Sequence, residues 1–99
     1  MEKKIDALKS KISFGEMDLG KSITVVFISV GGDVKCPIKC KSKQMFWEIE
    51  NLFYEKFPKY KKIIDYFFAA GNVVGTYKTL EENGIRDGST ILVFRKGLV

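Results

Sequence analysis

Hydrophobic and polar positions alternate along the chain from about residue 22, and the period of this alternation changes from one segment to the next. Residues 22–30 (SITVVFISV) are rich in β-branched side chains and phenylalanine, which favours a strand. Residues 34–40 (VKCPIKC) alternate one by one, which predicts a second strand with one apolar face. Between them, Gly31-Gly32-Asp33 tolerates the backbone of a tight turn, so a hairpin is expected. Pro37 cannot donate to a ladder, which predicts an edge strand with this position facing outward.

The pattern becomes helical after the second strand. Phe46, Ile49, Phe53 and Phe57 recur at spacings of three and four, which predicts a helix over residues 43–57 that packs through this stripe. Ser42 is the expected N-cap. Pro58 disfavours the α conformation at the residue before it, so the helix should end there. A basic connector, residues 59–62, follows.

The last third of the chain returns to strand patterns. Residues 63–70 (IIDYFFAA) predict a third strand closed by a turn at Gly71-Asn72, and residues 73–74 a short fourth. Residues 79–85 predict a helical turn that Thr79 caps and Gly84 ends. Residues 89–94 predict a final strand. The expected fold is therefore α+β, in the order β-β-α-β-β-β, with one long helix across one sheet.

This order and its spacing resemble the β-grasp fold of ubiquitin-like proteins. The positions that carry the resemblance are a strand-ending Gly71, a Thr79-Leu80 helical turn, a buried Ile85 and a terminal strand through residues 91–93. The resemblance covers residues 22–96 and implies a mixed sheet and a protein that acts by binding other proteins. The N-terminal segment and the lysine-flanked second strand are similar to the SUMO branch.

The resemblance also divides the chain and bears on conjugation. Residues 1–21 are expected to form a flexible tail, or a short helix through Ile5, Leu8 and Ile12. Residues 22–96 are expected to form the domain and residues 97–99 a C-terminal tail.

Conjugated relatives need a terminal Gly-Gly where this sequence reads Gly97-Leu98-Val99. We therefore expect an interaction module that is not conjugated and that could serve as a subunit of a larger assembly. The alternative is a SUMO- or ubiquitin-type modifier whose C-terminus is processed or incomplete here.

The composition argues against an enzyme and against a metal site. The chain contains no histidine, so it cannot build a Ser–His or Cys–His nucleophile, and no glycine-rich phosphate loop precedes its helix. Cys36 and Cys40 would lie on one face of a strand about 13 Å apart, too far for a shared metal ion or a disulfide. We expect both thiols to be core residues, with no catalytic residue, metal or cofactor.

Aromatic residues point instead to a protein partner. In a single sheet covered on one side by a helix, consecutive apolar residues on a strand must face both sides. We expect the outer side to carry Leu92, Phe94 and either Phe67 or Phe68, depending on register. Such apolar patches commonly mark interaction sites. The alternative is that the N-terminal tail covers them.

Lysines and net charge add weaker expectations. Lys35, Lys39 and Lys41 could flank a secondary groove that receives an acidic-hydrophobic strand, as in SUMO-like domains, or could simply protect an edge strand from pairing. The formal charge of +5 raises nucleic acid as a partner, but no RNA-binding aromatic motif accompanies it, so nucleic acid is not expected. No apolar run approaches the roughly 20 residues of a membrane helix, and no secretory signal is evident. We expect an intracellular protein, cytoplasmic or nuclear.

Overall fold

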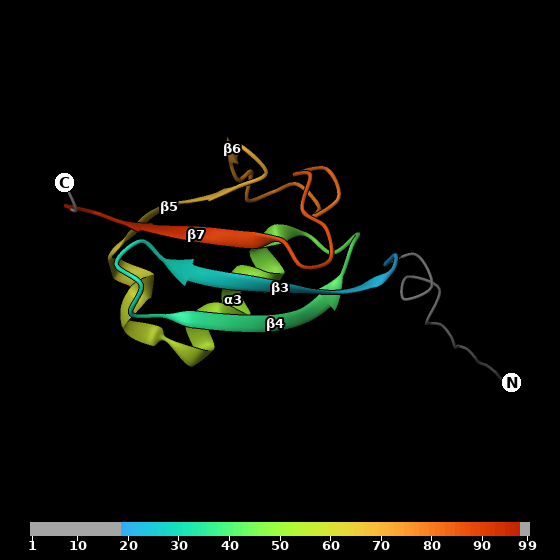
Figure 1. Cartoon of the computed structure of the whole chain (residues 1–99). Coiled ribbons are helices and arrows are strands. Elements are labelled where there is room, and N and C mark those ends of the chain that lie inside the picture. The colour runs from blue at the N-terminus through green and yellow to red at the C-terminus, as the bar shows by residue number, and fades with distance from the viewer. Residues whose placement is uncertain (1–18, 98–99) are drawn as a thin grey trace, which may run out of the picture.

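The computed structural model describes residues 19–97, and the predictions for residues 1–18 and 98–99 lie outside this range. A mixed sheet and one α-helix make up the described fold (Figure 1). The strands are β3 (Ser22–Ser29), β4 (Lys35–Lys41), β5 (Ile64–Ala69), β6 (Asn72–Val73) and β7 (Thr90–Arg95). The helix is α3 (Phe46–Lys56), followed by a short 3₁₀ helix, η1 (Pro58–Lys62). The predicted β-β-α-β-β-β order is confirmed.

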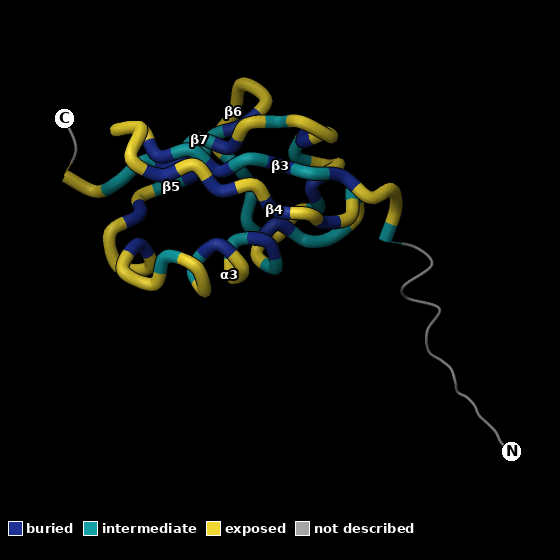
Figure 2. Tube along the Cα trace, turned by 60° about the horizontal axis from the view of Figure 1, so that its bottom comes forward, coloured by how far each residue is buried: buried dark blue, intermediate teal, exposed yellow. Residues whose placement is uncertain are grey.

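The sheet has five strands in the order β4-β3-β7-β5-β6. The central pair, β3 and β7, is parallel, and the other pairs are antiparallel. The helix α3 crosses one face of this sheet and leaves the other face uncovered by any described element (Figures 1 and 2). Pro37 lies on β4, which is an edge strand as predicted.

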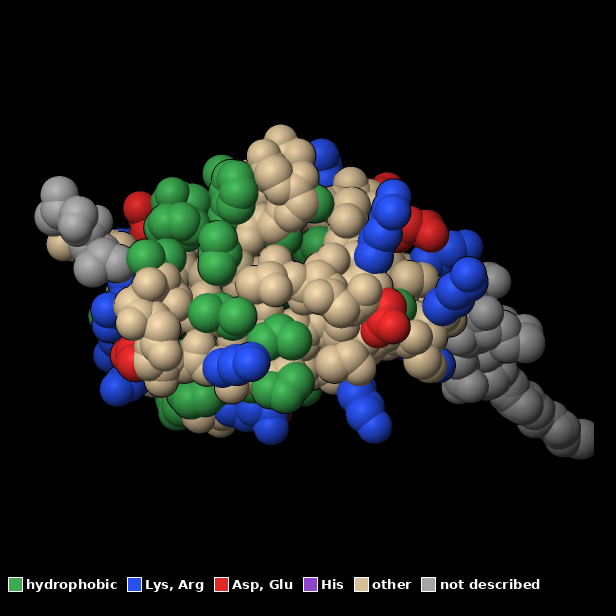
Figure 3. Space-filling view, viewed as in Figure 1, with side chains coloured by type: hydrophobic (Ala, Val, Ile, Leu, Met, Phe, Trp, Pro, Cys, Tyr) green, Lys and Arg blue, Asp and Glu red, His purple; other side chains and the backbone are tan. Residues whose placement is uncertain are grey.

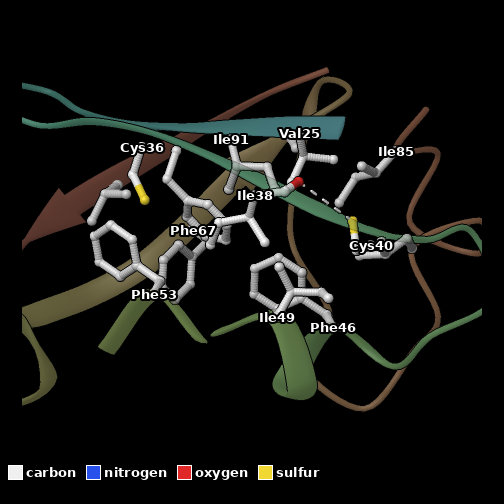
Figure 4. Packing of buried hydrophobic residues seen from close by; sticks show 14 of the residues in the cluster. Val25, Cys36, Ile38, Cys40, Phe46, Ile49, Phe53, Phe67, Ile85 and Ile91 are labelled. Atoms are coloured by element: carbon white, nitrogen blue, oxygen red, sulfur yellow. Dashed lines mark hydrogen bonds between the residues drawn. The ribbon is translucent and has the colours of Figure 1, made fainter. Parts of the chain in front are cut away.

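The core fills the layer between the sheet and α3. Alternate residues of β3 and β4 are buried, and Phe46, Ile49 and Phe53 bury the inner stripe of the helix. Phe27 from β3 stacks on Phe53, with ring centroids 4.8 Å apart. Figure 4 shows the aromatic and aliphatic side chains of both layers packed together. The alternation predicted for the second strand therefore separates the core and surface side chains of β4 correctly.

The helix begins three residues later than predicted, and Ser42 is not its cap. The Ser42 hydroxyl instead accepts a hydrogen bond from the Lys21 amide (3.0 Å). The first helical amides, those of Phe46 and Trp47, donate to the carbonyl oxygens of Lys78 (2.8 Å) and Thr76 (3.1 Å). A loop from far along the chain thus satisfies donors that a local cap would otherwise satisfy. At the other end, Phe57 leaves the α region, at φ −133° and ψ 70°, as Pro58 predicts.

The predicted basic connector forms η1 and buries one of its residues. Tyr60 is 1% exposed and closes the end of the core beside Phe53, with ring centroids 5.8 Å apart. Its hydroxyl donates to Asp33 in the β3–β4 hairpin (3.3 Å), which links the hairpin to η1.

The turn after β5 lies one residue earlier than predicted. It contains Ala70 and Gly71, both at positive φ (54° and 82°), and it pairs Ala69 with Asn72. Two consecutive residues at positive φ match a two-residue hairpin turn of the primed type. Alanine tolerates this conformation poorly, which explains why the sequence did not mark this position as a turn residue.

The predicted helical turn near Thr79 is present. The Thr79 hydroxyl accepts from the Glu82 amide (3.0 Å), and the Glu82 carboxylate accepts from the Thr79 amide (2.9 Å), which is a capping box. Gly84 ends the turn at φ 75°.

The segment assigned to the N-terminal tail is anchored where it meets the sheet. The Leu19 carbonyl accepts from the Lys43 amide (2.8 Å), and the Lys21 carbonyl accepts from the Ser42 amide (2.9 Å). These bonds hold residues 19–21 against the β4–α3 loop.

Candidate functional site: the outer face of the sheet

The face of the sheet opposite α3 carries a continuous group of apolar side chains. We call this group the outer patch. It comprises six partly buried residues from the three inner strands of the sheet: Val26, Ile28, Tyr66, Phe68, Leu92 and Phe94. Figure 3 looks onto this face and shows hydrophobic side chains gathered over β5 and β7 and continuing toward β4.

Strand register brings the patch together. Leu92 on β7 lies between Ile28 on β3 and Phe68 on β5, and Phe94 lies opposite Tyr66. The rings of Tyr66 and Phe94 are stacked, with centroids 4.7 Å apart and planes at 10°. Phe68 meets Phe94 edge-on at 6.4 Å. Aromatic pairs in these arrangements are individually favourable, which stabilises the packing of these three rings on the outer face.

Of the predicted patch residues, Phe68, Leu92 and Phe94 lie on the outer face, whereas Phe67 does not. Phe67 is 6% exposed and packs edge-on against Phe27 and Phe46 (5.7 and 5.2 Å between centroids). The assignment of Phe67 to the partner-binding surface was therefore wrong. The sequence left the choice between two neighbours open, and pairing of Phe67 with the inward-facing Val93 decides it.

A bulge explains why the inward-facing and outward-facing residues of β5 were hard to predict. The pairing with β7 shifts between Ile64 and Tyr66, and Asp65 occupies the irregular position. Ile64, Phe67 and Ala69 are buried, so the inward residues are not separated by two throughout. Tyr66, Val26 and Ile28 were not singled out from the sequence. Alternation along the strands could have identified them: Tyr66 is two residues from Phe68, and Val26 and Ile28 flank the buried Phe27.

The predicted lysines border the outer patch. Lys35, Lys39 and Lys41 are exposed along β4, where they pair with Ile28, Thr24 and Ser22 respectively. The Lys41 ammonium group donates to the Ser22 hydroxyl (2.8 Å). The patch thus has a basic margin along one long side.

The free edge of β4 offers few hydrogen-bond donors. The Ser29 amide donates to the Val34 carbonyl (3.1 Å), so every second pair along this hairpin is hydrogen-bonded and Lys35, Pro37 and Lys39 direct their backbone groups outward. Pro37 has no N–H, and the Lys41 amide donates to the Gln44 side chain (2.7 Å). Only Lys35 and Lys39 retain outward donors, which disfavours the strand addition that the secondary groove requires.

The opposite edge of the sheet is the two-residue strand β6, which covers part of β5. The short strand β6 pairs with Phe68 and Ala69, and the Val74 amide donates to the Phe67 carbonyl (2.8 Å). Ile64, Asp65 and Tyr66 are the positions of β5 beyond this cover. Binding through the face of the sheet therefore meets fewer obstacles than binding through either edge.

The two cysteines are buried and free. They occupy separate positions along β4, and the Cys40 thiol donates to the Ile38 carbonyl (Figure 4). Burial raises the pKa of Cys36 and raises that of Cys40 to about 11. At neutral pH both are thiols, which are poor nucleophiles and poor metal ligands.

Outside the outer patch, the Asp33 carboxylate accepts hydrogen bonds from the hydroxyls of Ser29 and Tyr60. The hydrogen bond from Ser29 is the main reason that the pKa of Asp33 lies below its usual value, and the bonds from its own backbone and from Tyr60 add to it. In residues 19–97, no three His, Cys, Asp or Glu side chains are grouped closely enough to hold a metal ion. Within the same range, no helix is sufficiently long and apolar to cross a membrane.

The helix-covered mixed sheet, with its capped turn before β7, defines a ubiquitin-like β-grasp domain, and solved structures confirm this fold. The ubiquitin-like domain of an Arabidopsis thaliana protein superposes with a TM-score of 0.67 at 16% identity, over 95% of this chain and 92% of that one. The UBL domain of Plasmodium falciparum Dsk2 gives 0.65 at 17% identity, over 77% and 100%. Caldiarchaeum subterraneum ubiquitin gives 0.64 at 14%, over 79% and 98%.

Sequence comparisons find no such relationship. No model of a protein family matches the chain, and no curated protein matches it. At these low identities the structural likeness establishes the fold, and the function has to be argued from the outer face itself.

Proposed function

We propose that this ubiquitin-like domain is a non-catalytic module that binds another protein through the outer patch. The observation that supports the proposal most directly is the patch itself, in which six apolar side chains adjoin on a face that no described element covers. Contiguous exposed apolar surface on a small domain commonly marks an interaction site. Tyrosine and phenylalanine are also enriched at the centres of protein interfaces.

Other functional classes receive less support from the same surface. The buried cysteines and the lack of histidine leave no activated nucleophile among the residues described. Nucleic-acid platforms on sheets use open aromatic faces on which bases stack. Here Tyr66 and Phe94 stack on each other, so each ring covers one face of the other. A protein with its own apolar side chains fits this surface better.

Affinity capture from native cells tests the proposal when it compares three forms of the full chain. Wild type and Tyr77→Ala should retain the same partner, because Tyr77 is 81% exposed and lies outside the outer patch. Phe94→Ala should lose it, since a central aromatic anchor typically contributes about 2 kcal/mol or more. Circular dichroism should show that all three forms are folded.

Chemical-shift mapping with the purified partner then locates the contact. Amide shifts centred on β7 and β5 would support the outer patch. Binding that is unaffected by Phe94→Ala but abolished by Lys35→Glu or Lys39→Glu would refute it and favour the secondary groove.

A further inference from the structure

The exposed side of α3 forms a second surface, on the opposite side of the domain from the outer patch (Figure 2). Two of its large apolar side chains are unusually accessible, Trp47 at 41% and Leu52 at 37%. On a helix with 100° per residue, Glu48, Asn51 and Glu55 project between these two. We call these five residues the helix face. It carries two carboxylates between two apolar margins. The Glu48 carboxylate also accepts a hydrogen bond from the Met45 amide (3.1 Å), and Lys61 of η1 lies beside Asn51 and Glu55 at the other end.

The helix face and the outer patch are complementary in charge and in spacing. Lys35 and Lys39 are four residues apart on a strand, or about 13 Å. Glu48 and Glu55 are seven residues apart on a helix, or about 10 Å. Each pair follows the length of its element, and each lies beside apolar side chains. A helix laid along the strands could therefore place its carboxylates over the lysines and its apolar margins over the patch.

We propose that the helix face of one copy of this protein docks on the outer patch of a second copy. The inference rests on the outer patch being a binding surface, as argued above, and it names one occupant. Because the two surfaces differ and lie on opposite sides, the contact is head-to-tail and leaves a free surface at each end. Assembly would then proceed beyond dimers as concentration rises.

The size of the contact sets its strength. The helix α3 has 11 residues, so it is about 16 Å long and, with side chains, about 10 Å wide. Such a footprint is well below the roughly 800 Å² per partner of stable interfaces. The self-association is accordingly weak, and a tighter partner competes with it for the outer patch.

Sedimentation velocity of the full chain, from about 10 μM to 1 mM at physiological salt, tests the proposal. The wild-type sedimentation coefficient should rise with concentration. Lys39→Glu and Glu55→Lys should each weaken association by about tenfold or more, because each places like charges together. Glu81→Lys makes the same charge change as Glu55→Lys at an exposed site outside both surfaces, and it should behave as wild type.

Mixing the two defective variants provides the sharpest test. Each retains one intact surface, and the two altered surfaces are again opposite in charge, so a one-to-one mixture should recover association. A protein that stays monomeric at 1 mM, or one that is sensitive to Lys39→Glu but not to Glu55→Lys, would overturn the head-to-tail contact. If the monomer still bound a partner in a Phe94-dependent way, the proposed function would stand and only this inference would fall.

Discussion

Replacing Phe67 or Phe94 by alanine tests the assignment of the two sheet faces. The two residues lie on neighbouring strands, and the sequence alone made both of them candidates for the partner-binding surface. The structure gives them opposite environments, since Phe67 is 6% exposed in the core and Phe94 is partly exposed on the outer patch. The same chemical change should therefore have unequal effects on the free energy of unfolding.

The contacts of Phe67 predict a large loss. Its ring packs against four others, those of Phe27, Phe46, Phe53 and Tyr54, at centroid distances of 5.7, 5.2, 6.3 and 6.4 Å. Three of these neighbours are fully buried and have little room to relax into a cavity. Phe→Ala in a core costs about 3–5 kcal/mol, and we expect Phe67→Ala near the upper end.

The contacts of Phe94 predict a smaller loss. Its main partner is the stacked ring of Tyr66, and aromatic pairs contribute about 0.5–1.5 kcal/mol beyond burial. With its partial exposure, Phe94→Ala should cost about 1–2 kcal/mol. This exceeds the negligible loss expected of a freely exposed ring.

Urea denaturation followed by far-UV circular dichroism measures both losses. In thermal unfolding, 1 kcal/mol corresponds to about 4–8 °C for a domain of this size, so the two variants should be well separated. Phe68→Ala, the neighbour that faces outward, is the matched control and should resemble Phe94→Ala. Equal losses for Phe67→Ala and Phe68→Ala would refute the face assignment and reopen the register of β5.

Three further predictions concern the turn, the thiols and the hairpin. Ala70→Gly should stabilise the domain by up to about 1 kcal/mol in urea denaturation, because glycine relieves the positive φ of 54°; a clear loss would contradict the turn geometry. Cys36 and Cys40 should react with a thiol reagent only on unfolding, and rapid labelling of the native protein at pH 7.5 would disagree with their burial. The pKa of Asp33 is lower in the folded than in the unfolded state. The ionised carboxylate therefore stabilises the fold above the unfolded-state pKa, and this stabilisation is lost as the pH falls through the folded-state pKa. Wild type should thus lose more stability than Asp33→Asn on acidification below about pH 4, and equal losses would remove Asp33 as the cause.

The fold could be predicted from the sequence because its signals are local and redundant. The alternation in residues 34–40, the Phe46, Ile49 and Phe53 stripe and the Thr79 capping box each specify one element by itself. The predicted element boundaries were wrong where contacts with distant segments of the chain determine them. At the start of α3, the carbonyls of Lys78 and Thr76 accept the amides of Phe46 and Trp47, which the local sequence does not reveal, while the Glu48 side chain accepts from the Met45 amide.

The candidate site was only partly predictable for a related reason. Alternation identifies two sets of residues on a strand, but a bulge changes which set faces inward. On β5, Asp65 introduces such a bulge, and the pairing with β7 then determines that Phe68 faces outward and Phe67 inward. Tyr66 belongs to the site because its ring stacks on that of Phe94. The two residues are 28 positions apart in the chain, so the sequence does not reveal this contact.

The chemistry of β4 connects the fold to the proposed mode of binding. An edge strand with regularly spaced free N–H donors can pair with strands of other molecules. On β4, Pro37 has no N–H and the Lys41 amide donates to Gln44, so outward N–H donors remain only at Lys35 and Lys39. The same lysine side chains stand at the margin of the outer patch, where they would attract carboxylates of a partner. Residues 1–18 contain equal numbers of acidic and basic side chains, so the net charge of +5 belongs to the rest of the chain. Under the proposed function, the β4 edge disfavours strand addition, while the face, apolar at the centre and basic along one side, would suit a partner with apolar side chains and an acidic flank.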